Sequence, residues 1–229
     1  MLFVFVVLGL PAAVVGIPWS ALRGDFSTMY GWGIRIIRLG VRAAGIRVRV
    51  VGLEHVPVGR SCIFMSNHVS NLDPTVLLPA IPGMTSVLLK KELMGIPVLG
   101  MAMRMGRYVP VARGQSREEA QRSMELAAEA LKFGLHMTLF PEGTRSKDGK
   151  LLPFKKGGFY LAEDTGAPVV PVVITGTAQM MRKGGLKIFP GKAEVRFLPA
   201  LEARSFGSRE ELMEAVRAAM EAALGESAI

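Results

Sequence analysis

The sequence contains a single cysteine, Cys62, among 229 residues. One cysteine excludes an internal disulfide framework and cannot by itself form a structural zinc site, so a reducing compartment such as the cytosol is expected. Cys62 lies within the apolar run 62–65. A small buried core residue is therefore a better interpretation than a nucleophile, and we assign Cys62 no chemical role.

Signatures of nucleotide and metal binding are also missing. The chain has no phosphate-binding loop, no dinucleotide fingerprint and no cluster of acidic residues suited to a catalytic metal. Its chemistry is therefore predicted to need no cofactor and no metal. Aromatic residues make up only 7% of the chain. Together with the lack of a recognised nucleic-acid-binding motif, this argues against a nucleic-acid partner.

The first 22 residues lack any charged side chain, although Pro11 and Pro18 lie inside the run and would kink or end a helix. This leader is barely long enough to span a membrane. It also lacks the basic start and clear cleavage site of a secretory signal, so we expect it to be retained.

The next segment, residues 27–44, has the pattern of an amphipathic helix. Arg35, Arg38 and Arg42 share one stripe, and apolar residues occupy another face. A basic face beside an apolar one fits a helix in the cytoplasmic interface of an anionic membrane. The alternative is a core-packing helix with solvated arginines.

The overall composition supports a membrane attachment. Hydrophobic residues make up 50% of the chain, the formal net charge is +9 and the pI is about 10.1. Such a basic balance implies an anionic partner. We predict membrane-anchoring helices over residues 1–45 and one domain over residues 46–229. We place the protein at the cytoplasmic face of a membrane, with the bacterial inner membrane as the expected one.

From residue 47 onward, apolar strand-like runs alternate with helical patterns, which is typical of an α/β domain. The expected strands cover residues 48–51, 62–65, 86–89, 108–112, 137–140, 169–174 and 193–198. Pro110 and Pro171 indicate that two of these are edge or bulged strands. Helices over 116–133 and 208–224 both open with Ser-Arg-Glu-Glu, a capping box. We therefore predict a mixed, largely parallel central sheet flanked by helices, preceded by a membrane-associated two-helix motif.

Polar residues follow the ends of five predicted strands. They are His68, Lys90, Lys91, Arg113, Glu142, Arg145, Thr175 and Gly176. Ligands of α/β sheets bind outside the carboxyl ends of the strands. Residues scattered along the chain are therefore expected to meet in one crevice.

His68 and Asp73 are the candidate catalytic pair. An imidazole takes up and returns a proton near neutral pH, and a carboxylate on Nδ1 leaves Nε2 free as a base. Asp73 lies five residues after His68, close enough to reach back if the chain turns. Asp73 is also followed by Pro74, which is typical of a helix N-cap. The capping and catalytic roles are compatible.

The run 140–146 supplies a candidate phosphate site. Arg145 offers five donors, Thr144 a hydroxyl, Glu142 a carboxylate, and Gly143 allows close backbone approach. Arg145 and Arg113 together could hold a phosphate monoester. The nearby lysines are interpreted as solvated surface charge. A methionine-rich stripe at residues 94, 101 and 105 would suit an acyl-chain tunnel, but it is interpreted as core filling.

These motifs resemble, in their order, the glycerolipid acyltransferase family, specifically the 1-acyl-glycerol-3-phosphate (lysophosphatidic acid) acyltransferases. The matching residues are Asn67-His68 with Asp73, Gly106 with Arg113, Phe140 to Ser146, and Val170 to Ile174. The resemblance covers residues 50–175. One departure is visible, because the interval from Gly106 to Arg113 is one residue longer than usual.

The resemblance implies that His68 is the general base and Asp73 orients it. It also implies that Arg113, Glu142 and Arg145 bind the glycerol-phosphate acceptor, with Gly143 shaping the pocket. We hypothesise that His68 deprotonates the sn-2 hydroxyl of lysophosphatidic acid as it attacks an acyl thioester, either acyl-CoA or acylated acyl carrier protein. Phosphatidic acid would be the product. The alternatives are an acyl thioesterase, which would activate water instead, and a non-catalytic basic membrane-binding protein.

Overall fold

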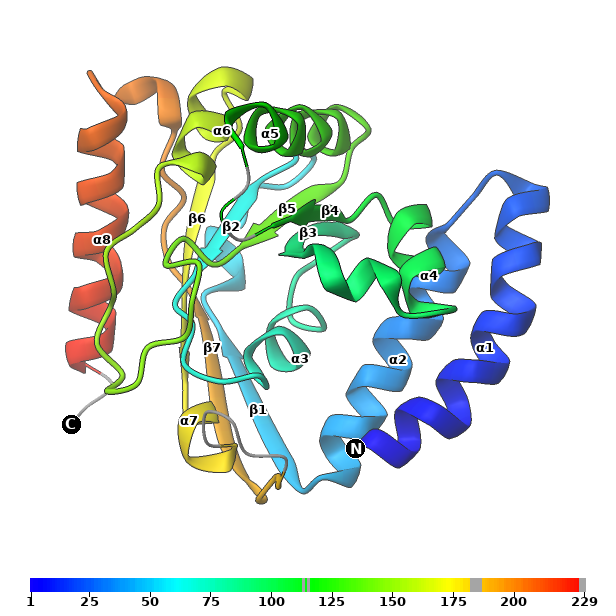
Figure 1. The fold of residues 1–229 in the computed structure, drawn as a ribbon. Helices are drawn as coiled ribbons and strands as arrows, with labels where there is room; N and C mark the ends of the chain where they lie inside the picture. Colours follow the sequence, from blue (N-terminus) through cyan, green and yellow to red (C-terminus); the bar gives the residue numbers. More distant parts are fainter. Residues whose placement is uncertain (113, 115, 182–186, 227–229) are drawn as a thin grey trace.

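The computed structural model describes residues 1–112, 114, 116–181 and 187–226. Within these residues, seven strands form one sheet in the order β1-β7-β6-β2-β5-β3-β4 (Figure 1). Every neighbouring pair is parallel except β6 with β7. The strands are β1 (Ile46–Val51), β2 (Ile63–Ser66), β3 (Thr85–Lys90), β4 (Val109–Val111), β5 (His136–Leu139), β6 (Val169–Thr175) and β7 (Gly191–Phe197). The predicted α/β fold with a mixed, largely parallel sheet is confirmed.

Helices cover both faces of this sheet (Figure 1). They are α1 (Leu2–Arg23), α2 (Ser27–Ala43), α3 (Asp73–Leu77), α4 (Leu99–Met105), α5 (Arg117–Lys132), α6 (Gly157–Thr165), α7 (Thr177–Met180) and α8 (Arg209–Glu226). Short 3₁₀ turns are η1 (Leu53–His55), η2 (Lys91–Gly95) and η3 (Ala203–Ser205). Helices α5, α6 and α8 pack on one face, and α2, α3 and α7 pack on the other. Helix α1 lies outside α2, away from the sheet (Figure 1).

Two hydrophobic cores result, one on each face. Along β2, Ile63 and Met65 face the α5, α6 and α8 side, whereas Phe64 faces the α2 and α3 side. All four residues of β2 are buried. A central parallel strand is covered on both faces, so it appears in the sequence as a continuous apolar run rather than an alternating one.

The two strand prolines behave differently. Pro110 lies in β4, which is the edge strand that the sequence predicted. Pro171 lies in β6, between β2 and β7. The β6–β7 ladder begins only at Val172, and a separate bridge joins Val169 to Leu201. Pro171 therefore falls in an interruption of the ladder, where its missing N–H breaks no regular pair.

The predicted helix starts at residues 116 and 208 can be compared directly. At α5, Ser116 Oγ accepts from Glu119 N and Glu119 Oε2 accepts from Ser116 N, which completes the capping box. At α8, Ser208 Oγ accepts from Glu211 N, as expected. There, however, the Glu211 carboxylate accepts from Gly207 N. The glutamate of this second capping box therefore accepts from the residue before the serine, and not from the serine itself.

The N-terminal helices form an antiparallel pair (Figure 1). The sequence suggested that Pro11 and Pro18 would kink or end a helix. Helix α1 continues through both prolines to Arg23, so neither of them ends it. Residues Val4–Arg23 are long and apolar enough to cross a membrane, and only 17% of that window is buried. Helix α2 buries Val41 against the domain, and Arg38 donates to the Pro79 carbonyl oxygen. The hairpin is thus fixed to the domain through α2, while most of α1 is left uncovered.

Candidate active site

The topology brings the carboxyl ends of five strands to one edge of the sheet. Strands β2, β3, β4, β5 and β6 are all mutually parallel. His68 follows β2, Glu142 and Arg145 follow β5, and Thr177 follows β6. This is the shared edge that the sequence predicted. Arg113, which was expected to follow β4, lies outside the described residues.

His68 and Asp73 are in direct contact. The two atoms His68 Nδ1 and Asp73 Oδ2 are 2.7 Å apart. The Asp73 side chain is fully buried, whereas 18% of the His68 side chain is exposed. The imidazole also stacks on Phe140, with ring centroids 4.2 Å apart and planes inclined by 23°. The carboxylate thus approaches Nδ1 and leaves Nε2 as the ring nitrogen available for proton transfer.

Asp73 is the first residue of α3, but it does not cap that helix with its side chain. Its Oδ2 atom instead accepts from the backbone amides of Val69 and Ser70, at 2.7 and 2.8 Å, in addition to its contact with His68. The carboxylate therefore closes the turn that carries His68. The sequence interpretation that Asp73 also serves as an N-cap is not supported by these bonds.

Glu142 joins the second motif to His68. Its Oε1 accepts from the His68 backbone amide at 2.8 Å, and its Oε2 accepts from Leu152 N at 2.9 Å. A second link runs the other way, because Ser146 N donates to the His68 carbonyl oxygen at 2.8 Å. Burial raises the pKa of Glu142, while the two amide hydrogen bonds oppose that shift. Both carboxylate oxygens are thus engaged by the backbone.

The candidate phosphate-binding residues Gly143, Thr144 and Arg145 lie on the loop after β5, next to Glu142. Gly143 has a φ of +64°, and a Cβ there would lie 2.7 Å from Lys155 Cε and 2.9 Å from Lys155 Nζ. The left-handed backbone at this position favours glycine, and the Lys155 side chain lies across it. Thr144 is exposed and Arg145 is partly buried, and Arg145 directly precedes the residue bonded to His68. Lys155 was predicted to be solvated surface charge, and it is exposed, but its side chain also lies against this loop.

The other basic residues near the edge are less closely associated with it. Lys156 forms an exposed ion pair with Glu210, and Lys91 lies 3.5 Å from Glu119. These agree with the interpretation of solvated charge. The methionine stripe does not agree with core filling, because Met101 is 47% exposed and the methionines at 94 and 105 are only partly buried.

Two contacts at the site were not predicted. Thr177 Oγ1 donates to Asp73 Oδ1 at 2.6 Å, and both side chains are fully buried. Asn67 joins β2 to β6, since its side chain bonds both the N–H and the carbonyl oxygen of Ile174. The sequence offered one signal for Thr177, namely a hydroxyl just after a buried strand and Gly176. Nothing in the sequence indicated its partner.

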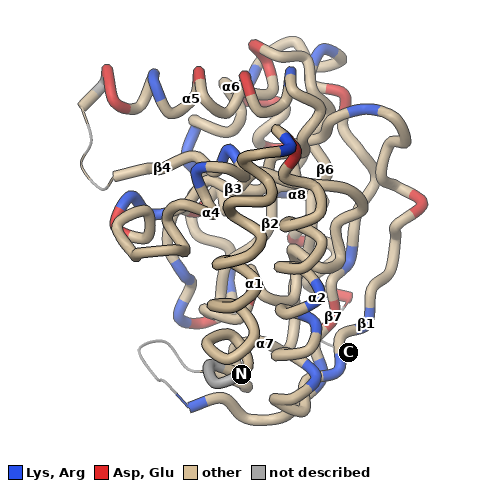
Figure 2. Tube along the Cα trace, turned by 90° about the vertical axis from the view of Figure 1, so that its right-hand side faces the viewer, with Lys and Arg blue, Asp and Glu red and all other residues tan. Residues whose placement is uncertain are grey.

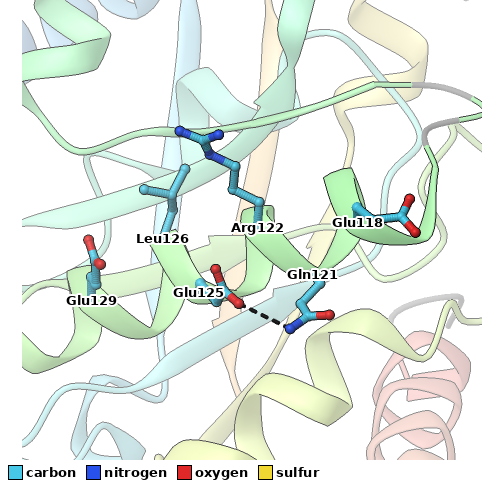
Figure 3. A pocket seen from close by; sticks show the side chains of 6 residues that line it. All are labelled: Glu118, Gln121, Arg122, Glu125, Leu126 and Glu129. Carbon is cyan, nitrogen blue, oxygen red and sulfur yellow. Dashed lines mark hydrogen bonds between the residues drawn. The ribbon is translucent and has the colours of Figure 1, made fainter.

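A surface hollow of about 550 Å³ lies elsewhere, along α5 (Figure 3). It is lined by Glu118, Gln121, Arg122, Glu125, Leu126 and Glu129. Gln121 Nε2 donates to Glu125 Oε1 at 3.2 Å. Three carboxylates and one cation make a poor site for a phosphate, and none of the candidate catalytic residues lines it. The candidate active site is therefore the one at the carboxyl ends of the strands, and not this hollow.

Known proteins share both the sequence and the fold of this chain. Over 188 residues it is 32% identical to a 1-acyl-sn-glycerol-3-phosphate acyltransferase of Limnanthes douglasii, covering 82% of this chain and 66% of the relative. The alpha form of Homo sapiens is 32% identical over 189 residues, with the same two coverages. A chloroplastic enzyme of Brassica napus is 38% identical over 165 residues, covering 72% of this chain and 46% of the relative.

The chain thus spans about two thirds of the length of the Limnanthes and human proteins, and about half of the Brassica one. A crystal structure of the 1-acyl-sn-glycerophosphate (LPA) acyltransferase PlsC from Thermotoga maritima matches with a TM-score of 0.79 at 29% identity. That match covers 98% of this chain and 94% of the other. The family model named Acyltransferase matches residues 47–175, more than half of the chain. The protein therefore belongs to the acyltransferase family.

Proposed function

We propose that this protein transfers a fatty acyl group from an acyl thioester to the sn-2 hydroxyl of lysophosphatidic acid, forming phosphatidic acid. The family membership supports the reaction class, and the names of the relatives support the acceptor. The observation that carries the mechanism is the 2.7 Å contact between His68 Nδ1 and a fully buried Asp73 carboxylate. The donor is acyl-CoA or acylated acyl carrier protein.

In this mechanism, His68 Nε2 removes the proton of the acceptor hydroxyl as the hydroxyl oxygen attacks the thioester carbonyl. The imidazolium formed at that moment is stabilised by Asp73 through Nδ1. Collapse of the tetrahedral intermediate expels the thiolate, which takes up the proton. The neighbouring serine hydroxyls of Ser66 and Ser70 donate to backbone carbonyls and are fully buried. This arrangement favours direct transfer over an acyl-enzyme.

The acceptor phosphate is assigned to the loop after β5. Arg145 would supply paired donors, with Thr144 and Lys155 adding a hydroxyl and a second charge. Gly143 lets the Lys155 side chain lie against the loop backbone, and Arg113 is expected to join from the segment after β4. For Glu142 we propose a supporting role, because both of its oxygens already accept backbone N–H groups. Arg145→Lys should therefore raise the KM for lysophosphatidic acid about tenfold or more, with a smaller change in kcat.

Attachment to the cytoplasmic face of an anionic membrane completes the proposal. Helix α1 provides the apolar surface, and the arginines of α2 provide the charge that anionic headgroups attract. The full chain should cosediment with vesicles containing phosphatidylglycerol and should bind duplex DNA much more weakly at the same salt concentration. Equal binding to DNA would contradict this attachment.

The decisive experiment measures thiol release from acyl-CoA by the purified full-length protein, with and without lysophosphatidic acid. His68→Ala should lower the acceptor-dependent rate by on the order of 10³-fold. His136→Gln is a matched control, because it changes a histidine at the opposite end of β5 from the site. Near-normal release by a folded His68→Ala protein would reject the mechanism. Release that does not depend on the acceptor would instead indicate a thioesterase.

A further inference from the structure

The segment between β3 and β4 exposes an unusual amount of apolar surface. It consists of η2 and α4, and we call residues 91–105 the η2–α4 segment. Leu93, Ile96, Leu99 and Met101 are 37 to 47% exposed. Single exposed apolar side chains are ordinary, but four within nine residues form a patch that calls for a partner.

This patch continues the uncovered surface of α1. Helix α4 contacts α1, and the two lie side by side in both orientations (Figures 1 and 2). Val14 and Val15 of α1 are 65% and 59% exposed. In Figure 2, the α1 trace carries no charged residue along most of its length, and its one charged residue, Arg23, is the last residue of the helix. The two elements therefore present one apolar face with a basic border.

The η2–α4 segment is also held in a defined shape. Val98, which precedes α4, has φ +66° and ψ −56°, a conformation that β-branched residues rarely adopt. A Cβ on Gly100 would lie 2.0 Å from the Met94 carbonyl oxygen, so the two halves of the segment are folded tightly on each other. Arg104 donates to that same carbonyl oxygen at 3.1 Å. Strain of this kind is retained where the surrounding structure fixes it, and it clusters at functional segments.

We propose that the η2–α4 segment is a second membrane-contacting element, seated beside α1 at the boundary between headgroups and acyl chains. The proposal rests on the membrane attachment described under Proposed function and extends it into the catalytic domain. Lys90, Lys91 and Arg104 lie at or next to the patch and are exposed, so positive charge borders it, as expected beside anionic headgroups. A bilayer accounts for both the apolar patch and its charged border.

The position of the segment gives it a consequence for catalysis. It begins where β3 ends, and β3 is the neighbour of β5 in the sheet. The loop carrying Glu142 and Arg145 leaves β5 at the same edge. Seating the η2–α4 segment in the membrane therefore holds this edge of the sheet at the surface in which a lysophospholipid resides.

The experiment uses introduced cysteines labelled with a nitrobenzoxadiazole fluorophore. Cys62 is fully buried, and burial raises its pKa to about 11, so it should not react with the label. Ile96→Cys and Leu99→Cys report on the segment, and Val14→Cys reports on α1. Val58→Cys is the matched control, because Val58 is 97% exposed in the connection between η1 and β2. Full-length proteins are mixed with vesicles of phosphatidylethanolamine and phosphatidylglycerol.

The proposal predicts that the Ile96, Leu99 and Val14 reporters shift to shorter wavelength and are quenched by lipids brominated in their chains. The Val58 reporter should keep its spectrum in water. If only the Val14 reporter enters the lipid, this proposal is wrong, while the membrane attachment and the reaction stand. If the Val14 reporter also stays in water, the attachment itself fails. A shift that depends on protein concentration without vesicles would overturn the proposal in favour of self-association.

An independent observation concerns the second oxygen of Asp73. Oδ2 receives hydrogen bonds from residues 68–70, whereas Oδ1 receives the hydroxyl of Thr177 at 2.6 Å. Thr177 is the first residue of α7 and follows Gly176. A Cβ at Gly176 would lie 2.1 Å from the Lys192 carbonyl oxygen, so the backbone just before Thr177 packs closely against β7. We infer that Thr177 is a positioning residue, which fixes the rotation of the Asp73 carboxylate and thereby the plane of the His68 imidazole.

The test compares Thr177→Val with Thr177→Ser. Valine keeps the shape and loses the hydroxyl, so kcat should fall about tenfold or more while the KM for the acceptor stays near the native value. Serine should restore most of kcat. Native kcat in the valine variant, or a serine variant as impaired as the valine one, would overturn the inference. Thr177→Ala provides the same comparison if the valine variant does not fold.

Discussion

Two histidines of this protein are each held through Nδ1, yet by opposite partners. At His68, the partner is the Asp73 carboxylate, an acceptor. At His136, the partner is the backbone N–H of Cys62, a donor at 3.0 Å. A ring nitrogen that accepts a hydrogen bond carries no proton, so His136 is fixed in the tautomer opposite to the one that Asp73 favours at His68. The residue type is shared, and the partner decides which nitrogen can act as a base.

Their surroundings reinforce the difference. His68 lies after the end of β2 and stacks on Phe140, with part of its side chain open to solvent. His136 begins β5, at the opposite edge of the sheet, and meets Phe64 edge-on with ring centroids 5.2 Å apart. Burial lowers the pKa of His136. One imidazole is thus arranged to exchange protons, and the other is arranged to remain neutral within the fold.

Among changes to the partners that hold the two histidines, replacing Asp73 with asparagine should produce the largest effect. The amides of Val69 and Ser70 both donate to Oδ2, so an asparagine should place its oxygen there and keep the acceptor for His68 Nδ1. The tautomer would be preserved and the negative charge lost. We expect kcat to fall on the order of 10²-fold or more, measured as acceptor-dependent thiol release.

The Asp73→Asn result also separates charge from orientation. The asparagine NH₂ would take the place of Oδ1, and the Thr177 hydroxyl can rotate to accept from it instead of donating. The melting temperature should therefore stay close to that of the native protein. Native kcat in this variant would mean that orientation alone suffices and that the comparison of the two histidines overstates the role of the carboxylate.

Glu142→Gln should have the next largest effect, because it perturbs the backbone of His68 rather than its ring. Both Glu142 oxygens accept from amides, so a glutamine must turn its own NH₂ toward one donor. We expect a loss of about 1–3 kcal/mol in the free energy of unfolding. We also expect about a tenfold lower kcat with little change in the KM for the acceptor. A large rise in that KM with unchanged stability would instead favour direct binding of substrate by Glu142.

The fold could be predicted from the sequence because its strongest signals are local. Central strands such as β2 and β6 are buried on both faces and appear as unbroken apolar runs, and the capping box at Ser116 marks the start of α5. The contact between His68 and Asp73 was also accessible, since five residues and one turn separate the pair. What could not be predicted depends on strand register. The contact of Thr177 with Asp73 joins residues 104 positions apart, and no local pattern encodes it.

Whether an apolar helix face is buried or exposed could not be predicted from the sequence either. The methionines at 94, 101 and 105 have the spacing of a buried helix face, and that spacing is the same whether the face meets a core or a membrane. Only the placement of α4 beside α1 distinguishes the two. Changing Ile96 and Leu99 together to aspartate should therefore lower the rate on vesicle-borne acceptor several-fold, with little effect on detergent-dispersed acceptor. Val58→Asp is the control, and an equal loss in both assays would indicate damage to the site itself.

His136→Gln should have the smallest effect on activity and a distinct effect on stability. The glutamine oxygen can still accept from Cys62 N, so kcat should remain near the native value. Because the pKa of His136 is lowered in the folded state, its contribution to stability is fully present above the unfolded value of about 6.5 and is lost as the pH falls through the lowered folded value. The native protein should therefore lose more unfolding free energy than the variant on acidification below about pH 6.5. Urea unfolding across that range measures the difference, and parallel pH profiles would contradict a neutral, structural His136.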